Sequence, residues 1–312
     1  MKAWQYERDG APLALNEVPE PVAGPGEVLI DVKASGICHS DIGYLDGTIS
    51  NLLPGGPVTL GHEIAGIVSD RGEGVTTTAV GDRVAIKADL LGPGCGRDGG
   101  FAPKVAVQAE FLVPIPEGVS WDQAAVSTDG GMTSFHAVTV RGQVTTGDRV
   151  GIIGFGGLGS LGLQIALGLG AEVFVADTKE SLFPQITEAG ASGVANTIGD
   201  FTDVGLDVVI DFAGYGTTTA EAITAVRHGG RVVQVGLGVS RATIDVNDLT
   251  LREIELVGSL GGTVEDNEQV LDMMARGALA SRTTLIEFDG VAEAIERLRR
   301  GENSGRFVML NH

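Results

Sequence analysis

Residues 149–159 read Arg-Val-Gly-Ile-Ile-Gly-Phe-Gly-Gly-Leu-Gly, and they join the pattern of a buried strand to a glycine-rich loop. An apolar run with helical spacing, Leu158 to Leu169, follows at once. Glycines at such a junction permit a tight turn, a close approach of the backbone to a pyrophosphate and close packing of helix on strand. The first turn of the helix adds unpaired N–H groups and the positive end of a dipole. The stretch therefore predicts a dinucleotide site formed by Gly154, Gly156, Gly157, Leu158 and Gly159.

An acidic residue, Asp177, ends the next strand pattern, which begins at Glu172. A carboxylate at that point can accept hydrogen bonds from the ribose hydroxyls of an adenosine, and it would repel a 2′-phosphate. This favours NAD over NADP, although the nearby Lys179 would suit a phosphate. The alternative is a glycine-rich turn of purely structural purpose, with Asp177 as an ordinary surface carboxylate.

The segment around the glycine loop alternates strand and helix patterns. Such alternation predicts βαβ units and a parallel sheet covered on both faces, which is the doubly wound Rossmann arrangement of an α/β protein. Its further strands are expected at 207–212 and 231–236, and its further helices at 182–189 and 219–226.

The residues before this segment follow a different sequence pattern. Short β-rich runs at 28–33, 64–69 and 83–87 are bounded by Gly and Pro turn signals, which is typical of a small antiparallel barrel or sandwich. After Leu260 come two helix patterns and a closing strand at 306–310. Because that strand starts no further βαβ unit, it could return to the first domain.

These patterns predict two domains. A catalytic domain is expected from residues 1–129 together with a return segment, residues 260–312, and a nucleotide-binding domain from residues 130–259.

The composition excludes several classes of protein. The chain has 312 residues, enough for about two domains with a core each. Its formal charge of −20 argues against nucleic-acid or anionic-membrane partners, because binding phosphates requires a positive field. No apolar stretch reaches the ~20 residues of a membrane span, and the N-terminus lacks the apolar core of a signal peptide. With two cysteines and no disulfide framework, we expect a reducing, cytoplasmic location.

Three segments carry side chains suited to zinc: Gly-Ile-Cys-His-Ser-Asp at 36–41, Gly-His-Glu-Ile-Ala-Gly at 61–66, and Ser-Thr-Asp-Gly-Gly at 127–131. Thiolate, neutral imidazole and carboxylate groups all bind zinc, and a catalytic site uses three of them and leaves one position open.

Each of these side chains also has a plainer interpretation. Cys38 could be a small buried apolar residue, His62 a hydrogen-bonded loop residue, and Asp129 the N-cap of a helix from Gly130 to Val140. Spacing along the chain alone does not bring the three together.

The motifs jointly resemble those of the zinc-dependent alcohol dehydrogenases of the medium-chain dehydrogenase/reductase superfamily, over essentially the whole chain. The runs that carry the resemblance are the two at 36–41 and 61–66, Gly81-Asp82-Arg83-Val84, the glycine loop at 154–159, and Asp211-Phe212-Ala213-Gly214. The resemblance implies a GroES-like β-barrel catalytic domain joined to a Rossmann domain, and a homodimer or homotetramer joined through the nucleotide-binding sheets.

The resemblance also implies a ligand set. Cys38 and His62 match catalytic zinc ligands, and Asp129 stands where many relatives have a second cysteine, as in bacterial secondary-alcohol dehydrogenases with an Asp ligand. Glu63 matches a conditional fourth ligand, and Asp41 matches the carboxylate that orients the zinc-bound imidazole.

For catalysis, the resemblance implies that Ser40 takes the proton of the alcohol while hydride passes to the nicotinamide. The family's histidine further along this relay is replaced by Gly43. The outer relay must therefore differ, with water or His39 as candidates.

On the cofactor side, the resemblance implies that Thr133 lies beside the nicotinamide and that His39 and Arg306 contact the pyrophosphate. Backbone contacts to the carboxamide are implied for Val235, Leu237 and Leu260. The alternatives are ordinary core packing for these last three residues and a surface ion pair for Arg306.

The largest departure from the family lies between Val84 and Phe101. Relatives usually carry four cysteines there around a second, structural zinc, whereas this chain has only Cys95. We therefore expect one catalytic zinc and no structural zinc, with Cys95 a free thiol in a shortened loop.

The sequence thus predicts a zinc- and NAD-dependent alcohol dehydrogenase, with secondary alcohols and ketones favoured over primary alcohols and aldehydes. The alternatives are a metal-free quinone or enone reductase of the same fold, a polyol dehydrogenase, and a non-catalytic nucleotide-binding protein.

Overall fold

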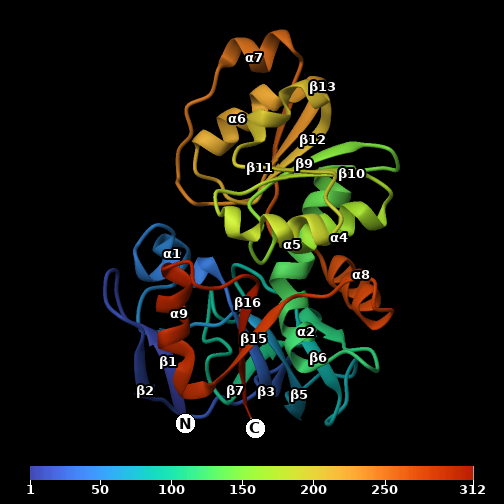
Figure 1. The fold of residues 1–312 in the computed structure, drawn as a ribbon. Coiled ribbons are helices and arrows are strands. Elements are labelled where there is room, and N and C mark those ends of the chain that lie inside the picture. Colours follow the sequence, from blue (N-terminus) through green and yellow to red (C-terminus); the bar gives the residue numbers. More distant parts are fainter. Residues whose placement is uncertain (312) are drawn as a thin grey trace. The chain divides into compact units, whose positions relative to one another are not determined.

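The computed structural model describes residues 1–311, which form two compact units (Figure 1). Unit 1 consists of Met1–Met132 and the segment from Thr263 onward, and unit 2 of Thr133–Gly262. The first division falls inside a helical segment that runs without a break from Trp121 to Arg141. The sequence-based expectation put the divisions after residues 129 and 259.

Unit 1 contains antiparallel sheets, as predicted. Its strands are β1 (Lys2–Tyr6), β2 (Ala14–Glu17), β3 (Glu27–Ile37), β4 (Val58–Thr59), β5 (Glu63–Arg71), β6 (Arg83–Ile86), β7 (Lys104–Gln108), β8 (Leu112–Pro114), β15 (Thr283–Glu287) and β16 (Arg306–Leu310). One sheet has the order β2–β1–β4; the larger one has the order β15–β16–β3–β5–β6–β8, with β7 beside β3. Among the described strands of unit 1, β15 and β16 alone pair in parallel.

The pairing of β3 with β5 sets the geometry of unit 1. Val28, Ile30 and Val32 alternate with less buried residues along β3, so one face of this strand lies in the core. The antiparallel register puts Gly36 opposite Glu63. The residues that follow β3 are therefore brought next to those that precede β5.

The C-terminal segment completes the same sheet. Strand β16 pairs antiparallel with β3, with Phe307 opposite Ile37. The preceding helix, α9 (Val291–Arg299), lies beside α1 (His39–Leu45) although the two are far apart in sequence (Figure 1). This return places Arg306, the first residue of β16, near the end of β3.

Unit 2 is a parallel sheet with helices on both faces, again as predicted. Its strands are β9 (Arg149–Ile153), β10 (Glu172–Ala176), β11 (Gly193–Ala195), β12 (Leu206–Asp211), β13 (Val226–Gln234) and β14 (Glu255–Gly258), in the order β11–β10–β9–β12–β13–β14. Helices α4 (Gly159–Gly168) and α5 (Phe183–Glu188) cover one face, and α6 (Thr217–Ala225) the other (Figure 1). The strand order reverses between β9 and β12, which is the switch point where such sheets bind ligands.

The remaining α-helices of the described residues are α2 (Trp121–Val126), α3 (Met132–Phe135), α7 (Val246–Leu251) and α8 (Val264–Ala275). Two π-helical turns, Ser127–Gly131 and His136–Arg141, interrupt the segment expected to be one regular helix after Gly130. Asp129 therefore lies inside a wide helical turn, and its interpretation as the N-cap of a new helix is wrong. Over residues 1–311, no helix combines the length and the apolar character needed to cross a membrane.

The core of unit 1 gives a direct test of this packing. Leu60 is fully buried among apolar side chains, whereas Leu91 is 79% exposed. We expect Leu60→Ala to lower the free energy of unfolding by about 2–5 kcal/mol, through lost apolar burial and the cavity left behind. The same change at Leu91 is expected to stay within about 0.5 kcal/mol of the parent protein. Urea unfolding followed by circular dichroism measures both, and equal effects would contradict the assigned core.

Candidate metal and cofactor sites

Cys38 is held at the junction between β3 and α1. Its backbone N–H donates to Asp41 Oδ2 at 2.8 Å, so this carboxylate fixes the first turn of α1. The other oxygen of the fully buried Asp41 lies 3.6 Å from His62 Nδ1. Asp41 is thus placed to orient the His62 ring, the role that the family resemblance implies.

Glu63 is the first residue of β5, and His62 directly precedes it. Both are buried, and Glu63 is completely inaccessible to solvent. Room for the Glu63 side chain comes from Gly36, because a Cβ atom at that position would overlap the Glu63 carboxylate. The glycine of the 36–41 motif is therefore required by packing against the 61–66 motif.

Asp129 projects from the π-helical turn that follows α2. The Ser127 and Thr128 hydroxyls each donate, at 2.7 Å, to a carbonyl three residues earlier in the chain. Such side-chain bonds compete with backbone N–H groups for helix carbonyls, and wide turns of this kind are frequent at functional sites. The local sequence thus favours the irregular turn that carries Asp129.

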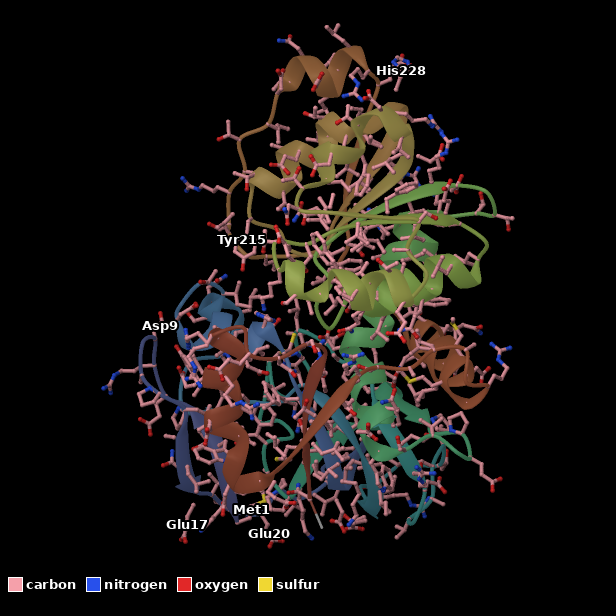
Figure 2. The ribbon with its side chains drawn as sticks, in the orientation of Figure 1. Met1, Asp9, Glu17, Glu20, Tyr215 and His228 are labelled. Atoms are coloured by element: carbon pink, nitrogen blue, oxygen red, sulfur yellow. The ribbon has the colours of Figure 1, made fainter. Side chains whose placement is uncertain are left out.

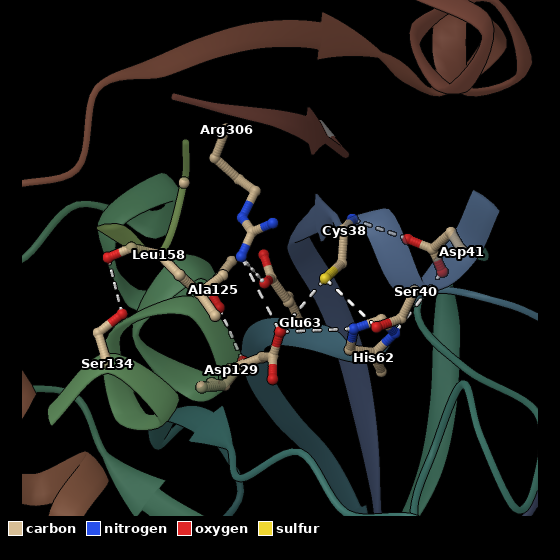
Figure 3. Close-up of polar contacts among 12 residues, drawn as sticks. Cys38, Ser40, Asp41, His62, Glu63, Ala125, Asp129, Ser134, Leu158 and Arg306 are labelled. Atoms are coloured by element: carbon tan, nitrogen blue, oxygen red, sulfur yellow. Dashed lines mark hydrogen bonds and ion pairs between the residues drawn. The ribbon is translucent and has the colours of Figure 1, made fainter. Parts of the chain in front are cut away.

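The four predicted ligand side chains meet in space. We call Cys38, His62, Glu63 and Asp129 the ligand cluster. One potential ligand atom from each side chain lies within 4.8 Å of those of the other three (Figure 3). Asp129 Oδ2 is 3.5 Å from Cys38 Sγ and 3.7 Å from His62 Nε2. A thiolate, an imidazole and two carboxylates in a buried site are a donor set that fits zinc.

Arg306 compensates the charge of this cluster. Its buried guanidinium lies 2.8 Å from Glu63 Oε1 and 3.9 Å from Asp129 Oδ2 (Figure 3). The surface ion pair considered for Arg306 is therefore wrong, because the pair is buried. Its contact with a pyrophosphate stays a prediction.

The surroundings of the cluster shift the pKa values of its two carboxylates in opposite directions. Burial raises the pKa of Glu63 to about 8, even though Arg306 opposes the shift. Burial also disfavours the Asp129 carboxylate, but hydrogen bonding to His62 and the charge of Arg306 hold the pKa of Asp129 well below its usual range. For His62 the nearby Asp41 and Asp129 outweigh burial and raise its pKa well above the ordinary value. Of the two carboxylates, Asp129 is thus the more readily ionised.

Ser40 lies at the rim of the ligand cluster. It is partly buried in the first turn of α1, with its Oγ 3.6 Å from Cys38 Sγ (Figure 3). The structure thus brings Ser40 to the cluster, whereas His39 beside it is exposed.

Three further contacts near the cluster have no signal in the local sequence. The Tyr44 ring stands edge-on to His62, with 6.4 Å between ring centroids, and its hydroxyl lies 3.1 Å from Cys95 Sγ. Cys95 is a buried free thiol, and this contact ties the shortened loop to α1. On the other side, buried Asn267 of α8 donates to Ser127 Oγ at 2.9 Å and so braces the turn that carries Asp129.

In unit 2 the glycine loop has the predicted geometry. Gly154 has a φ of +88°, a conformation that favours glycine, and a Cβ atom at Gly159 would overlap the Gly154 carbonyl. Helix α4 begins at Gly159, so its first N–H groups point toward the loop. This is the arrangement that binds a diphosphate.

Asp177 follows β10 at the edge of this loop. Its Oδ2 accepts from Phe155 N–H at 2.7 Å and its Oδ1 accepts from Lys179 N–H at 2.8 Å. Each carboxylate oxygen has a second lone pair, so the group can still accept ribose hydroxyls. Asp177 thus also stabilises the glycine loop, which its interpretation as an ordinary surface carboxylate omits.

The other predicted cofactor residues are spread along unit 2. Thr133 is buried in α3, and Val235 is partly buried directly after β13. Leu237 and Leu260 are 56% and 70% exposed. Ordinary core packing, the alternative for these two leucines, is therefore wrong.

The chain matches two family models. Residues 24–117 match the alcohol dehydrogenase GroES-like domain, and residues 157–276 match the zinc-binding dehydrogenase model. An alcohol dehydrogenase of Geobacillus stearothermophilus is 29% identical over 340 aligned positions, which span 99% of both chains.

Solved structures agree with these matches. Acetophenone reductase from Geotrichum candidum, in complex with NAD, is similar with a TM-score of 0.90 and 32% identity over 99% of this chain and 97% of that one. The alcohol dehydrogenase of Aeropyrum pernix has a TM-score of 0.91 and 25% identity over both full chains. On this evidence the chain belongs to the zinc-type alcohol dehydrogenases of the medium-chain dehydrogenase/reductase superfamily.

Proposed function

We propose that this protein oxidises alcohols and reduces the corresponding carbonyl compounds with NAD, and that Cys38, His62 and Asp129 hold its single catalytic zinc. The convergence of these three side chains with Glu63 is the observation that carries the proposal. Family membership makes the chain an oxidoreductase of alcohols and carbonyls. The ligand set, the number of zinc ions, the preference for NAD over NADP and the substrate are the proposed parts.

Bound at this cluster, zinc would act as a Lewis acid on the oxygen of the substrate. Asp41 keeps the His62 ring oriented through Nδ1, so that Nε2 faces Cys38 and Asp129. Ser40 accepts the proton of the alcohol through its hydroxyl, and exposed His39 or a water molecule passes this proton on, since Gly43 offers no side chain for the task. Glu63, balanced by Arg306, would be available as a conditional fourth ligand.

Secondary alcohols and ketones are the favoured substrates. The support is the carboxylate at position 129, which resembles the bacterial secondary-alcohol enzymes, and the similarity to a protein named as an acetophenone reductase. A primary-alcohol or polyol specificity is the alternative.

We also propose a homodimer or homotetramer joined through the sheets of unit 2. Strand β14 is an edge of that sheet and pairs only with β13 among the described residues. Leu256 on this strand is exposed, and an open edge with an exposed apolar residue is suited to pairing with a second copy.

A substrate panel with metal analysis tests the proposed function. We expect about one zinc per chain, faster turnover of secondary than of primary alcohols or polyols, and loss of activity after dialysis against a chelator, because the substrate oxygen then lacks its Lewis acid. Adding zinc back should restore the rate. Full activity of the chelated protein on quinones or enones would instead support the metal-free reductase.

The third ligand is tested at Asp129. We expect Asp129→Ala to lower zinc affinity by about a hundredfold or more, because loss of groups outside the ligand shell already costs 10–100-fold. Binding of NADH should persist, since the glycine loop lies in unit 2. Asp129→Cys should retain zinc, and Asp70→Ala on the exposed end of β5 is the matched control. Normal zinc content and turnover in Asp129→Ala would refute this ligand.

The cofactor preference is tested at Asp177. We expect Asp177→Asn to lower the ratio of kcat/KM for NAD over NADP by about tenfold or more, because a like charge about 4 Å from a phosphate costs about 1–4 kcal/mol. Glu180→Gln removes the same charge from an exposed neighbour and should leave the ratio unchanged. A ratio shifted equally by both variants would show that only the overall charge matters.

A further inference from the structure

The Asp211-Phe212-Ala213-Gly214 run has no role in the chemistry described above, yet its acidic residue is completely buried. Asp211 is the last residue of β12, and Gln234, the last residue of β13, is its register partner. A buried carboxylate at this point requires compensating hydrogen bonds. Where those bonds lead indicates its purpose.

Asp211 bonds to the loop that follows its own strand. Its Oδ1 accepts from the N–H groups of Ala213 at 3.0 Å and Gly214 at 2.8 Å, and its Oδ2 accepts from the Thr218 hydroxyl at 2.7 Å. The carboxylate thereby shapes residues 212–216. Tyr215 at the tip of this loop is exposed (Figure 2).

The hydrogen bonds of Asp211 also connect it to the loop after β13. The Thr219 hydroxyl of α6 lies 3.1 Å from Asp211 Oδ2 and 2.8 Å from Gln234 Oε1. The amide of Gln234 in turn donates to the Gly236 carbonyl at 2.8 Å. We call Asp211, Thr219 and Gln234 the strand-end network.

The two loops are also packed backbone against backbone. Gly214 has a φ of +69°, and a Cβ atom there would overlap the Gly236 carbonyl. The N–H groups of Val235 and Gly236 donate to the Asp211 carbonyl at 3.0 and 2.9 Å. These backbone contacts and the strand-end network together hold the two loops against each other.

The place of these two loops in the sheet indicates which half of the cofactor they face. The glycine loop follows β9, and Asp177 follows β10 on one side of the switch point. The adenosine half of a dinucleotide belongs on that side, so its other half extends over the ends of β12 and β13. Leu237, exposed in the loop after β13, offers an apolar surface for a flat ring.

We propose that Thr219 and Gln234 are positioning residues for the nicotinamide half of the cofactor, acting with Asp211 through the loops at 212–216 and 235–238. This inference rests on the proposed use of NAD. Their side chains hydrogen-bond to Asp211, to each other and to the Gly236 carbonyl, so their loss should affect only binding energy gained at the nicotinamide end.

The test compares NADH with ADP-ribose, which lacks the nicotinamide. Thr219→Val and Gln234→Met remove the polar groups and keep much of the side-chain volume. We expect each to raise the dissociation constant of NADH about tenfold, because the loop carbonyl and amide groups lose their fixed partners, while that of ADP-ribose stays within about twofold. The double variant should cost little more than one single change, since both break one connection.

Two control variants separate positioning from general damage. Thr219→Ser keeps the hydroxyl and should bind NADH like the parent protein. Thr224→Val makes the same change at an exposed position of the same helix and should change neither ligand. Fluorescence titration follows NADH and calorimetry follows ADP-ribose.

Equal weakening of both ligands, or unchanged NADH binding, in Thr219→Val and Gln234→Met would overturn the inference. Failure of the parent protein to bind either ligand would instead refute the proposed use of NAD. A variant that fails to fold is recognised by its melting curve, and the remaining single variant then decides.

Discussion

Four side chains that can carry charge lie within one another's reach in unit 1, three of them buried and Asp129 partly buried, and the structure around them has to compensate that charge. Arg306 does so from β16, with its guanidinium against Glu63 and close to Asp129. Isolated buried carboxylates would be strongly unfavourable, so this arginine is a condition for the ligand cluster to exist before metal binds. The return of the C-terminal segment onto β3 thus serves the site as well as the sheet.

Metal binding would change this balance. A zinc ligand must be deprotonated, whereas the carboxylates around His62 favour its protonated form. Zinc would replace that proton as the positive partner of Cys38 and Asp129. Asp41 lies 3.6 Å from the opposite nitrogen of the ring, on the side away from Cys38 and Asp129.

Unit 2 meets a different requirement, which is to hold an anionic cofactor on a chain with a formal charge of −20. Long-range attraction is unavailable, so local dipoles must supply the binding energy. The glycine loop and the first turn of α4 provide N–H groups, and Asp177 organises that loop through Phe155. The strand-end network likewise holds backbone groups in place, because its side chains hydrogen-bond to the loops that follow β12 and β13.

Much of this molecule was predictable because its signals are local. The glycine loop, the βαβ alternation and the β-rich runs of unit 1 each depend on short-range sterics and periodicity, and the structure contains them all. Less predictable was β13, which begins at Val226 directly after α6, because its first residues pair with β12 through an irregular register. The exposed Leu237 likewise followed an apolar strand pattern, and only the loop geometry turned it outward.

The sequence by itself determined the two kinds of sheet, the nucleotide loop and the residue types suited to zinc. Only the tertiary structure decided that Cys38, His62, Glu63 and Asp129 form one cluster, that Arg306 belongs to it, and that Asp211, Thr219 and Gln234 join two loops. The physical reason is that hydrogen bonds and ion pairs depend on distances of a few ångströms in space. Residues 38, 129 and 306 reach such distances only through strand register and a wide helical turn, which leave no periodic pattern in the chain.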